Sequence, residues 1–173
     1  QSGLLRKFGI SMQSMDTQTL KNIKRDNLKI NQIDSIIRSA ADADISVMVE
    51  LIVGLPGETY ESWTKNYCYL MEYENTSIEN YPCSLLNNSE LNNVDTIRDF
   101  KIEHKVVDFG PIASYHVQET VKQITGTYSM PSDVFKEVWA WTWCARLGHT
   151  FGITNEIVKK LKTDGVTTIV EFY

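Results

Sequence analysis

The stretch Glu50-Leu51-Ile52-Val53-Gly54-Leu55-Pro56-Gly57-Glu58-Thr59 decides the fold, because it joins a strand, a glycine-bounded turn and the start of a helix. Five of the six residues from 47 to 52 are apolar, and the sixth is Glu50. Such a run predicts a parallel strand that is buried on both faces. A carboxylate inside it is costly without a partner, so we expect the strand to deliver Glu50 to a site. The glycines beyond it would let a ligand approach the backbone.

The segments on either side of this strand alternate between strand and helix patterns. We expect strands over 8–12, 46–53 and 76–81, and helices over 17–24, 33–41 and after Thr59. Asp16, Asn31 and Thr59 are the expected N-caps of the three helices. The order strand, helix, strand, helix, strand predicts parallel pairing with right-handed crossovers. The fold class is therefore α/β, either a piece of a β/α barrel or an open doubly wound sheet.

The later part of the chain has a different pattern. Residues 82–94 are rich in Asn, Ser and Leu and are expected to form a loop, and 100–108 and 117–124 are weaker strand candidates. A helix from Asp133 to about Leu147 is apolar nearly all round, so we expect it to be well buried. A further short helix is expected over 154–162. We divide the chain into an α/β portion, 1–95, and a mainly helical C-terminal extension, 96–173.

Composition narrows the classes of function. The chain is 42% hydrophobic and 23% charged, with a net charge of −5, which argues against nucleic-acid or anionic-membrane partners. No apolar run reaches the roughly 20 residues that span a bilayer. Cys68, Cys83 and Cys144 are odd in number and widely spaced, so we expect no disulfide framework and a reducing, cytoplasmic location. The expected partner is a small molecule.

Three polar side chains are expected to converge at the carboxyl ends of the strands, where β/α proteins bind ligands. Gln13 ends the first strand, Arg25 follows one short helix later, and Glu50 lies on the next strand. Together they suit a zwitterionic, hydroxylated small molecule, because arginine binds carboxylates in bidentate pairs. Simpler explanations stay open: Glu50 paired with Arg25 or Lys24 in the core, and Gln13-Ser14 as a helix cap.

The segments Met12-Gln13-Ser14-Met15-Asp16 and 50–59, with Leu20, Ile23, Arg25 and Asn27 between them, resemble the later half of a radical S-adenosylmethionine (radical SAM) domain. The similarity extends to the subgroup that often carries a cobalamin-binding domain before the barrel, and to oxygen-independent coproporphyrinogen oxidases. The tail, with 127–130, the tryptophan-rich helix, His149 and 171–173, resembles that subgroup too. The resemblance implies a partial (β/α) barrel of radical SAM type followed by a mainly helical tail.

The resemblance also implies roles for single residues in SAM binding. Gln13, with Ser14 beside it, would contact the ribose or methionyl part, Arg25 the methionyl carboxylate, and Glu50 the hydroxyl groups. The adenine would lie on or near Ile52 and Gly54, in a segment that continues through Leu55 and Pro56. The strand end at Pro82-Cys83 would add a backbone contact to the base. No residue of this chain is implied as catalytic or metal-binding.

The cluster-binding motif of the family, Cys-x3-Cys-x2-Cys, does not occur in this sequence. The resemblance implies that a [4Fe–4S] cluster is held by an earlier half of the barrel, before Gln1, and that this part alone does not cleave SAM. Cobalamin is implied only by the subgroup, and the substrate is open. The alternatives are a truncated or degenerate, non-catalytic β/α module and a β/α-barrel lyase. The lyase is disfavoured because no lysine follows a strand and no phosphate-type glycine-rich loop occurs.

Overall fold

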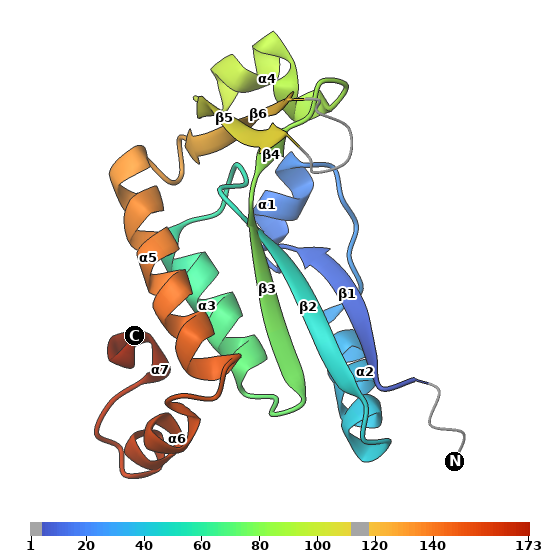
Figure 1. The fold of residues 1–173 in the computed structure, drawn as a ribbon, viewed down its shortest axis with the longest axis vertical. Helices are drawn as coiled ribbons and strands as arrows, with labels where there is room; N and C mark the ends of the chain where they lie inside the picture. The colour runs from blue at the N-terminus through green and yellow to red at the C-terminus, as the bar shows by residue number, and fades with distance from the viewer. Residues whose placement is uncertain (1–4, 112–117) are drawn as a thin grey trace.

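Three parallel strands form the main sheet of the protein. A computed structural model describes residues 5–111 and 118–173. The strands β1 (Lys7–Gln13), β2 (Ser46–Val53) and β3 (Thr76–Pro82) pair in the order β1-β2-β3, and all neighbours are parallel (Figure 1). The crossovers contain the helices α1 (Thr17–Asn22), α2 (Ile30–Asp42) and α3 (Tyr60–Met71). The α/β class and the parallel pairing are therefore confirmed.

The two faces of this sheet differ in burial. Val47, Val49 and Leu51 of β2 are at most 2% exposed and belong to the same apolar core as α2 and α3. Of the alternate residues of β2, Met48, Glu50 and Ile52 are half-buried and Ser46 is exposed. Figure 1 shows α2 behind β1 and β2 and no helix in front of the strands. The expectation that β2 is buried on both faces is thus wrong, because the helices cover one side of the sheet. We call the other side the open face, which carries Ser11, Met48, Glu50, Ile52, Ser77 and Glu79.

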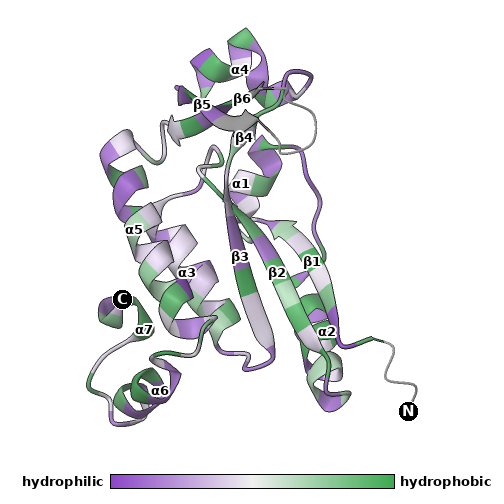
Figure 2. Ribbon diagram, in the orientation of Figure 1, coloured by the Kyte–Doolittle hydropathy of each residue, from purple (hydrophilic) through white to green (hydrophobic). Residues whose placement is uncertain are grey.

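Local signals place two of the three helix starts correctly. Asp16 caps α1 by accepting a hydrogen bond from the Thr19 N–H at 2.7 Å, and Thr59 caps α3 through the Ser62 N–H at 3.1 Å. The third expected cap, Asn31, is wrong, since α2 begins at Ile30 with Lys29 as its N-cap. Figure 2 shows β2 as mostly hydrophobic with a hydrophilic interruption, as the burial of one face requires.

A second, antiparallel sheet lies at the carboxyl end of the first. It consists of β4 (Ser84–Leu85), β6 (Gln118–Gly126) and β5 (Glu103–Pro111), in that order. The two weaker strand candidates are confirmed, although Val117 lies outside the described residues. The segment expected as a loop also contains β4 and a 3-10 turn, η1 (Glu90–Asn92), before helix α4 (Val94–Asp99). An apolar cluster forms under this sheet from Leu55, Cys83, Leu85, Ile102 and Ile124.

The chain ends in α5 (Ser132–His149), α6 (Asn155–Thr163) and α7 (Ile169–Phe172). Helix α5 packs on α3, and the buried indole of Trp63 donates to the Thr142 hydroxyl at 2.7 Å. The expectation that α5 is buried nearly all round is wrong, because Trp143 and Leu147 are 45% and 44% exposed.

The division of the chain at residue 95 stays a prediction, although β4 before that position pairs with β6 after it. Within residues 5–111 and 118–173, no helix combines the length and hydropathy needed to cross a bilayer.

Candidate functional site

Two of the predicted binding residues converge on a third residue, Ser11. Ser11 of β1 lies opposite Glu50 of β2 in the parallel register, and its hydroxyl donates to the Glu50 carboxylate. The main-chain carbonyl of Ser11 accepts a hydrogen bond from Arg25 Nη2 at 2.8 Å. Ser11 is exposed; its hydroxyl meets Glu50 on the open face, whereas its bond to Arg25 lies along the free edge of β1. The structure therefore brings Arg25 and Glu50 together through a serine that the sequence analysis did not single out.

Arg25 is oriented by a second side chain, Asn27. The Nε–H of Arg25 donates to Asn27 Oδ1 at 3.2 Å, while Asn27 Nδ2 donates to the carbonyls of Met12 (2.6 Å) and Ser14 (2.8 Å). These bonds anchor the Arg25 side chain to the end of β1. Because β1 is an edge strand, its carbonyls would otherwise lack hydrogen-bond donors from the protein. A guanidinium has five N–H donors in a planar fork, so the edge formed by Nη1 and Nη2 keeps donors for a carboxylate.

Glu50 is neither buried in the core nor paired with Lys24, whose ammonium pairs with Glu90 instead. In the register of the sheet its neighbour on β3 is Glu79, which forms an ion pair with Arg146 of α5. Ser11, Glu50 and Glu79 thus form a row across the open face, which we call the polar row. Carboxylates side by side on adjacent strands repel each other. A ligand that donates hydroxyl hydrogens between them would relieve this repulsion.

Gln13 lies at the end of β1 in a left-handed conformation, with φ of 61°. The register between β1 and β2 shifts between Ser11 and Gln13, as in a β-bulge. For a residue other than glycine, this conformation costs about 1–2 kcal/mol. Bulges of this kind redirect a side chain at a strand end. The structure therefore places Gln13 two residues beyond Ser11, at the carboxyl end of β1.

Ser14 is placed inside the protein rather than at its surface. It is 2% exposed, and its hydroxyl donates to the carboxylate of Glu58 and accepts the Asp16 N–H at 3.0 Å. The expected contact of Ser14 with SAM would therefore have to come from its main chain. Ser14 does not simply cap α1, since Asp16 does so.

Glu58 is a buried acid, and the sequence analysis did not single it out. It is 1% exposed and also accepts the Ser62 hydroxyl at 2.6 Å. Burial raises the pKa of Glu58, and the hydrogen bonds from Ser14 and Ser62 oppose that rise. Its position directly before the N-cap Thr59 was the available signal. Glu58 joins the end of β1 to the turn that follows β2.

The turn after β2 is packed against the protein's own side chains. Gly54, Leu55 and Pro56 are all buried. A Cβ on Gly54, where φ is +88°, would lie 2.7 Å from Phe135 Cε2. A Cβ on Gly57 would similarly lie 2.6 Å from Asn22 Nδ2. Side chains of the protein itself therefore approach Gly54 and Gly57 closely. These contacts explain the two glycines without a ligand.

Ile52 and the strand end at Pro82-Cys83 lie next to this turn. Ile52 is half-buried and packs against the cluster that contains Leu55. The Cys83 N–H donates to the Val53 carbonyl, and the Cys83 carbonyl accepts the Ile124 N–H, both at 2.9 Å. A base contact at this strand end would therefore use a remaining carbonyl lone pair. Burial raises the pKa of the Cys83 thiol to about 12, so the thiol is neutral near pH 7.

Aromatic side chains of α5 flank the open face. Phe135 stacks on Trp139 with ring centroids 6.4 Å apart, and Trp139 meets Trp143 edge-on at 6.3 Å. The Arg146 guanidinium lies 5.6 Å from the centre of the Trp143 ring. This stripe runs from Gly54, which Phe135 contacts, to Glu79, which pairs with Arg146. It forms a wall beside the polar row.

Comparison with known proteins finds a distant similarity to a radical SAM methyltransferase. No protein-family model matches the chain. A cobalamin-dependent radical SAM methyltransferase, TokK of Streptomyces tokunonensis, is 25% identical over 174 residues. The match covers 98% of this chain and 26% of the relative. The chain is thus a mixed α/β protein with distant similarity to a radical SAM methyltransferase. It spans about a quarter of that relative's length.

Proposed function

We propose that this chain is the later part of a radical SAM enzyme, in which β1, β2 and β3 belong to a (β/α) barrel and the open face looks into it. We further propose that the polar row binds SAM. The single observation that supports this most is the convergence of Arg25 and Glu50 on Ser11 near the carboxyl ends of parallel strands. Parallel β/α folds bind their ligands at this edge.

Each group of the site has chemistry that suits a part of SAM. The free edge of the Arg25 guanidinium would take the methionyl carboxylate as a bidentate pair. A cavity of about 440 Å³ lies beside Arg25, Ser11 and Asn27 along the free edge of β1 and offers space for it. Glu50 would accept the ribose hydroxyls, with Gln13 nearby. Ile52 and the main chain of the turn at 54–56 would lie near the adenine.

The other cofactors of such an enzyme would need residues outside this chain. Among residues 5–111 and 118–173, no three His, Cys, Asp or Glu side chains gather as metal ligands, so the described residues do not fit a [4Fe–4S] cluster. Cobalamin use is supported only by the distant relative's name. SAM, when bound, supplies the reactive group. The residues of this chain would orient it and, with the aromatic stripe of α5, limit the access of water and substrate.

Calorimetric titration of SAM into the intact polypeptide that carries this chain tests the proposal. Removing a charge-assisted bidentate pair in Arg25→Ala should weaken SAM binding about tenfold or more. Glu50→Gln should weaken it less, because the amide still accepts one hydroxyl. The matched control is Lys21→Ala, an exposed cation on α1, which should leave the affinity unchanged. Unchanged affinity in Arg25→Ala would reject the assigned role. A wild-type protein that does not bind SAM would favour a non-catalytic module.

A further inference from the structure

The segment 127–130 lies between β6 and α5 and contacts the turn after β2, and we call it the clasp. The Gly57 N–H of the turn donates to Ser129 Oγ at 2.8 Å, across 72 positions of the chain. The Pro56 carbonyl accepts a hydrogen bond from Asn22 Nδ2 at 3.0 Å, and the same amide lies 3.3 Å from the Tyr128 hydroxyl. The clasp therefore contacts the turn directly through Ser129 and indirectly through Asn22.

Hydrogen bonds within the clasp orient the Ser129 hydroxyl. The Thr127 N–H donates to the Met130 carbonyl at 2.8 Å, and the Met130 N–H donates to Thr127 Oγ1 at 3.2 Å. Ser129 Oγ lies 3.2 Å from Thr127 Oγ1. Because Ser129 Oγ accepts the Gly57 N–H, its own hydrogen can donate to Thr127 Oγ1. Thr127 and Met130 are 4% and 0% exposed, so the clasp is anchored in the interior of the protein.

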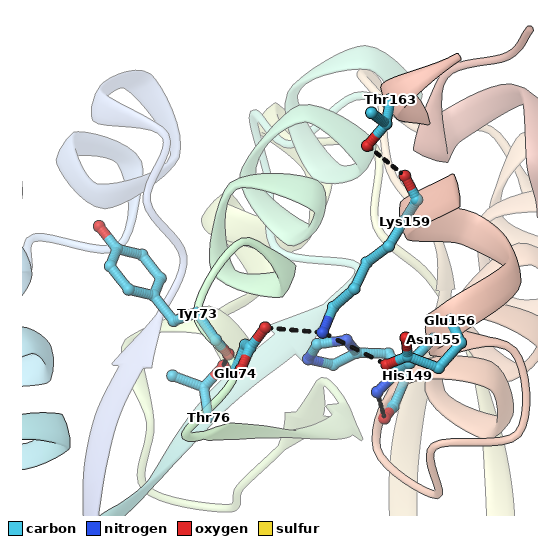
Figure 3. A network of polar contacts seen from close by, with 8 residues as sticks. All are labelled: Tyr73, Glu74, Thr76, His149, Asn155, Glu156, Lys159 and Thr163. Carbon is cyan, nitrogen blue, oxygen red and sulfur yellow. Dashed lines mark hydrogen bonds and ion pairs between the residues drawn. The ribbon is translucent and has the colours of Figure 1, made fainter. Parts of the chain in front are cut away.

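Neighbouring segments hold the clasp in place. The Tyr128 N–H donates to the Phe100 carbonyl at 2.9 Å, and the two rings stack with their centroids 6.0 Å apart. Helix α5 follows the clasp and packs on α3. At the other end of α5, Asn155 of α6 donates to the His149 carbonyl at 3.3 Å (Figure 3). These contacts do not involve the turn, so the clasp has supports of its own.

The turn, in contrast, takes part of its support from other segments. Gly54 and Gly57 have φ of 88° and 104°, and glycine loses more conformational freedom on folding than any other residue. The Phe135 ring packs against Gly54, and Ser129 binds the N–H of Gly57. Both supports come from the stretch 127–135, which leads from β6 into α5. That stretch therefore restricts the main chain of the turn at both of its glycines.

We propose that Ser129 is a positioning residue for the adenine half of SAM. Through the Gly57 N–H it holds the main chain of the turn where that main chain lies near the adenine. This inference rests on the proposed SAM site. The methionine half does not depend on Ser129, because Arg25 is held by Ser11 and Asn27 instead. A turn that is fixed before SAM arrives lowers the cost of ordering on binding.

The two halves of SAM, 5′-deoxyadenosine and L-methionine, are the probes that separate this role from general damage. Ligand-observed NMR on the intact polypeptide should show that Ser129→Ala weakens 5′-deoxyadenosine binding about three- to tenfold, the worth of one hydrogen bond, and leaves methionine binding unchanged. Ser129→Thr keeps the acceptor and should retain most of the affinity. The matched control is Ser89→Ala, because Ser89 is also half-buried but donates to the Leu86 carbonyl of its own loop. It should change neither ligand.

Hydrogen exchange followed by mass spectrometry tests the contact itself, without a ligand. The peptide that contains Gly57 should exchange faster in Ser129→Ala than in wild type or in Ser89→Ala. Unchanged exchange, unchanged 5′-deoxyadenosine binding, or equal weakening of both ligands in Ser129→Ala would overturn the role of Ser129 while the SAM site stands. A wild-type protein that binds neither ligand would overturn the proposed function, and this inference with it.

Discussion

The hydroxyl of Ser14 donates a hydrogen bond to the carboxylate of Glu58, which lies 44 positions later in the chain. Both residues are almost fully buried, at 2% and 1% exposure. The bond connects the end of β1 to the turn after β2, so the two strands that carry Ser11 and Glu50 share a buried contact just beyond their ends. This buried acid, which is not part of the open face, therefore helps to hold β1 against the turn that follows β2.

Glu58→Ala should lower the free energy of unfolding by about 2–4 kcal/mol, because it leaves a cavity, removes the acceptor of the Ser14 hydroxyl and leaves the Ser62 hydroxyl only the Thr59 carbonyl at 3.2 Å. Glu58→Gln keeps the shape and one acceptor, so its loss should stay within about 1 kcal/mol. Denaturant unfolding followed by circular dichroism measures both. Equal losses in the two variants would show that the hydroxyl bonds to Glu58 contribute little.

The raised pKa of Glu58 gives these variants a defined pH dependence. The folded protein holds the proton of Glu58 more tightly than the unfolded chain, whose pKa is near the ordinary 4.5. Ionisation therefore reduces stability as the pH rises from 4.5 towards the folded pKa. Glu58→Gln removes this term, so its stability relative to wild type should improve as the pH rises from about 4.5 through the raised pKa of the folded state. A relative stability that falls over this range would mean that the pKa is lowered.

Gly54→Ala should destabilise the protein for two separable reasons. The positive φ of 88° disfavours any Cβ by about 1–2 kcal/mol. Contact with the Phe135 ring adds overpacking, worth about 1–3 kcal/mol. When Phe135 is also replaced by alanine, only the cost of the positive φ should remain. Thermal unfolding of the two single variants and the double variant measures the coupling, and strictly additive losses would contradict the contact.

Asn27 should act on SAM binding by positioning Arg25. Asn27→Ala removes the acceptor for Arg25 Nε, as well as the donors to Met12 and Ser14. We expect SAM affinity to fall about three- to tenfold, the equivalent of one hydrogen bond. Asn27→Asp keeps the acceptor but loses the donors, so it should retain most of the affinity while losing similar stability. If Asn27→Asp and Asn27→Ala weaken SAM binding equally, Asn27 has only a structural role.

Thr142→Val should cost about 1–3 kcal/mol of stability, since it leaves the buried Trp63 N–H without an acceptor. Thr142→Ser keeps the hydroxyl and is the matched control, with a smaller loss from the missing methyl group. Chemical denaturation distinguishes them. Similar losses of stability in Thr142→Val and Thr142→Ser would contradict a role of the hydrogen bond in holding α5 on α3.

Local patterns in the sequence were enough for the order of elements up to β3, whereas β4, η1, α4 and α7 were not predicted. The apolar run of β2, the caps at Asp16 and Thr59, and the alternation of strand and helix all depend on residues close together in the chain. Parallel pairing followed because short crossovers with helices allow little else. The convergence of Arg25 and Glu50 near a strand end was also foreseeable, since parallel strands align their carboxyl ends.

Contacts between distant segments settled the rest, and no local pattern contains them. The open face depends on where α2, α3 and α5 pack against the sheet. The expectation that β2, with Glu50, is buried on both faces was therefore wrong. Ser11 became the meeting point because register places it opposite Glu50, and a serine in a strand carries no signal of that. Position 54 has no room for a side chain because Phe135, 81 residues later in the sequence, packs against it. Glu58 is buried because Ser14 and Ser62 supply the hydrogen bonds that a carboxylate loses with water.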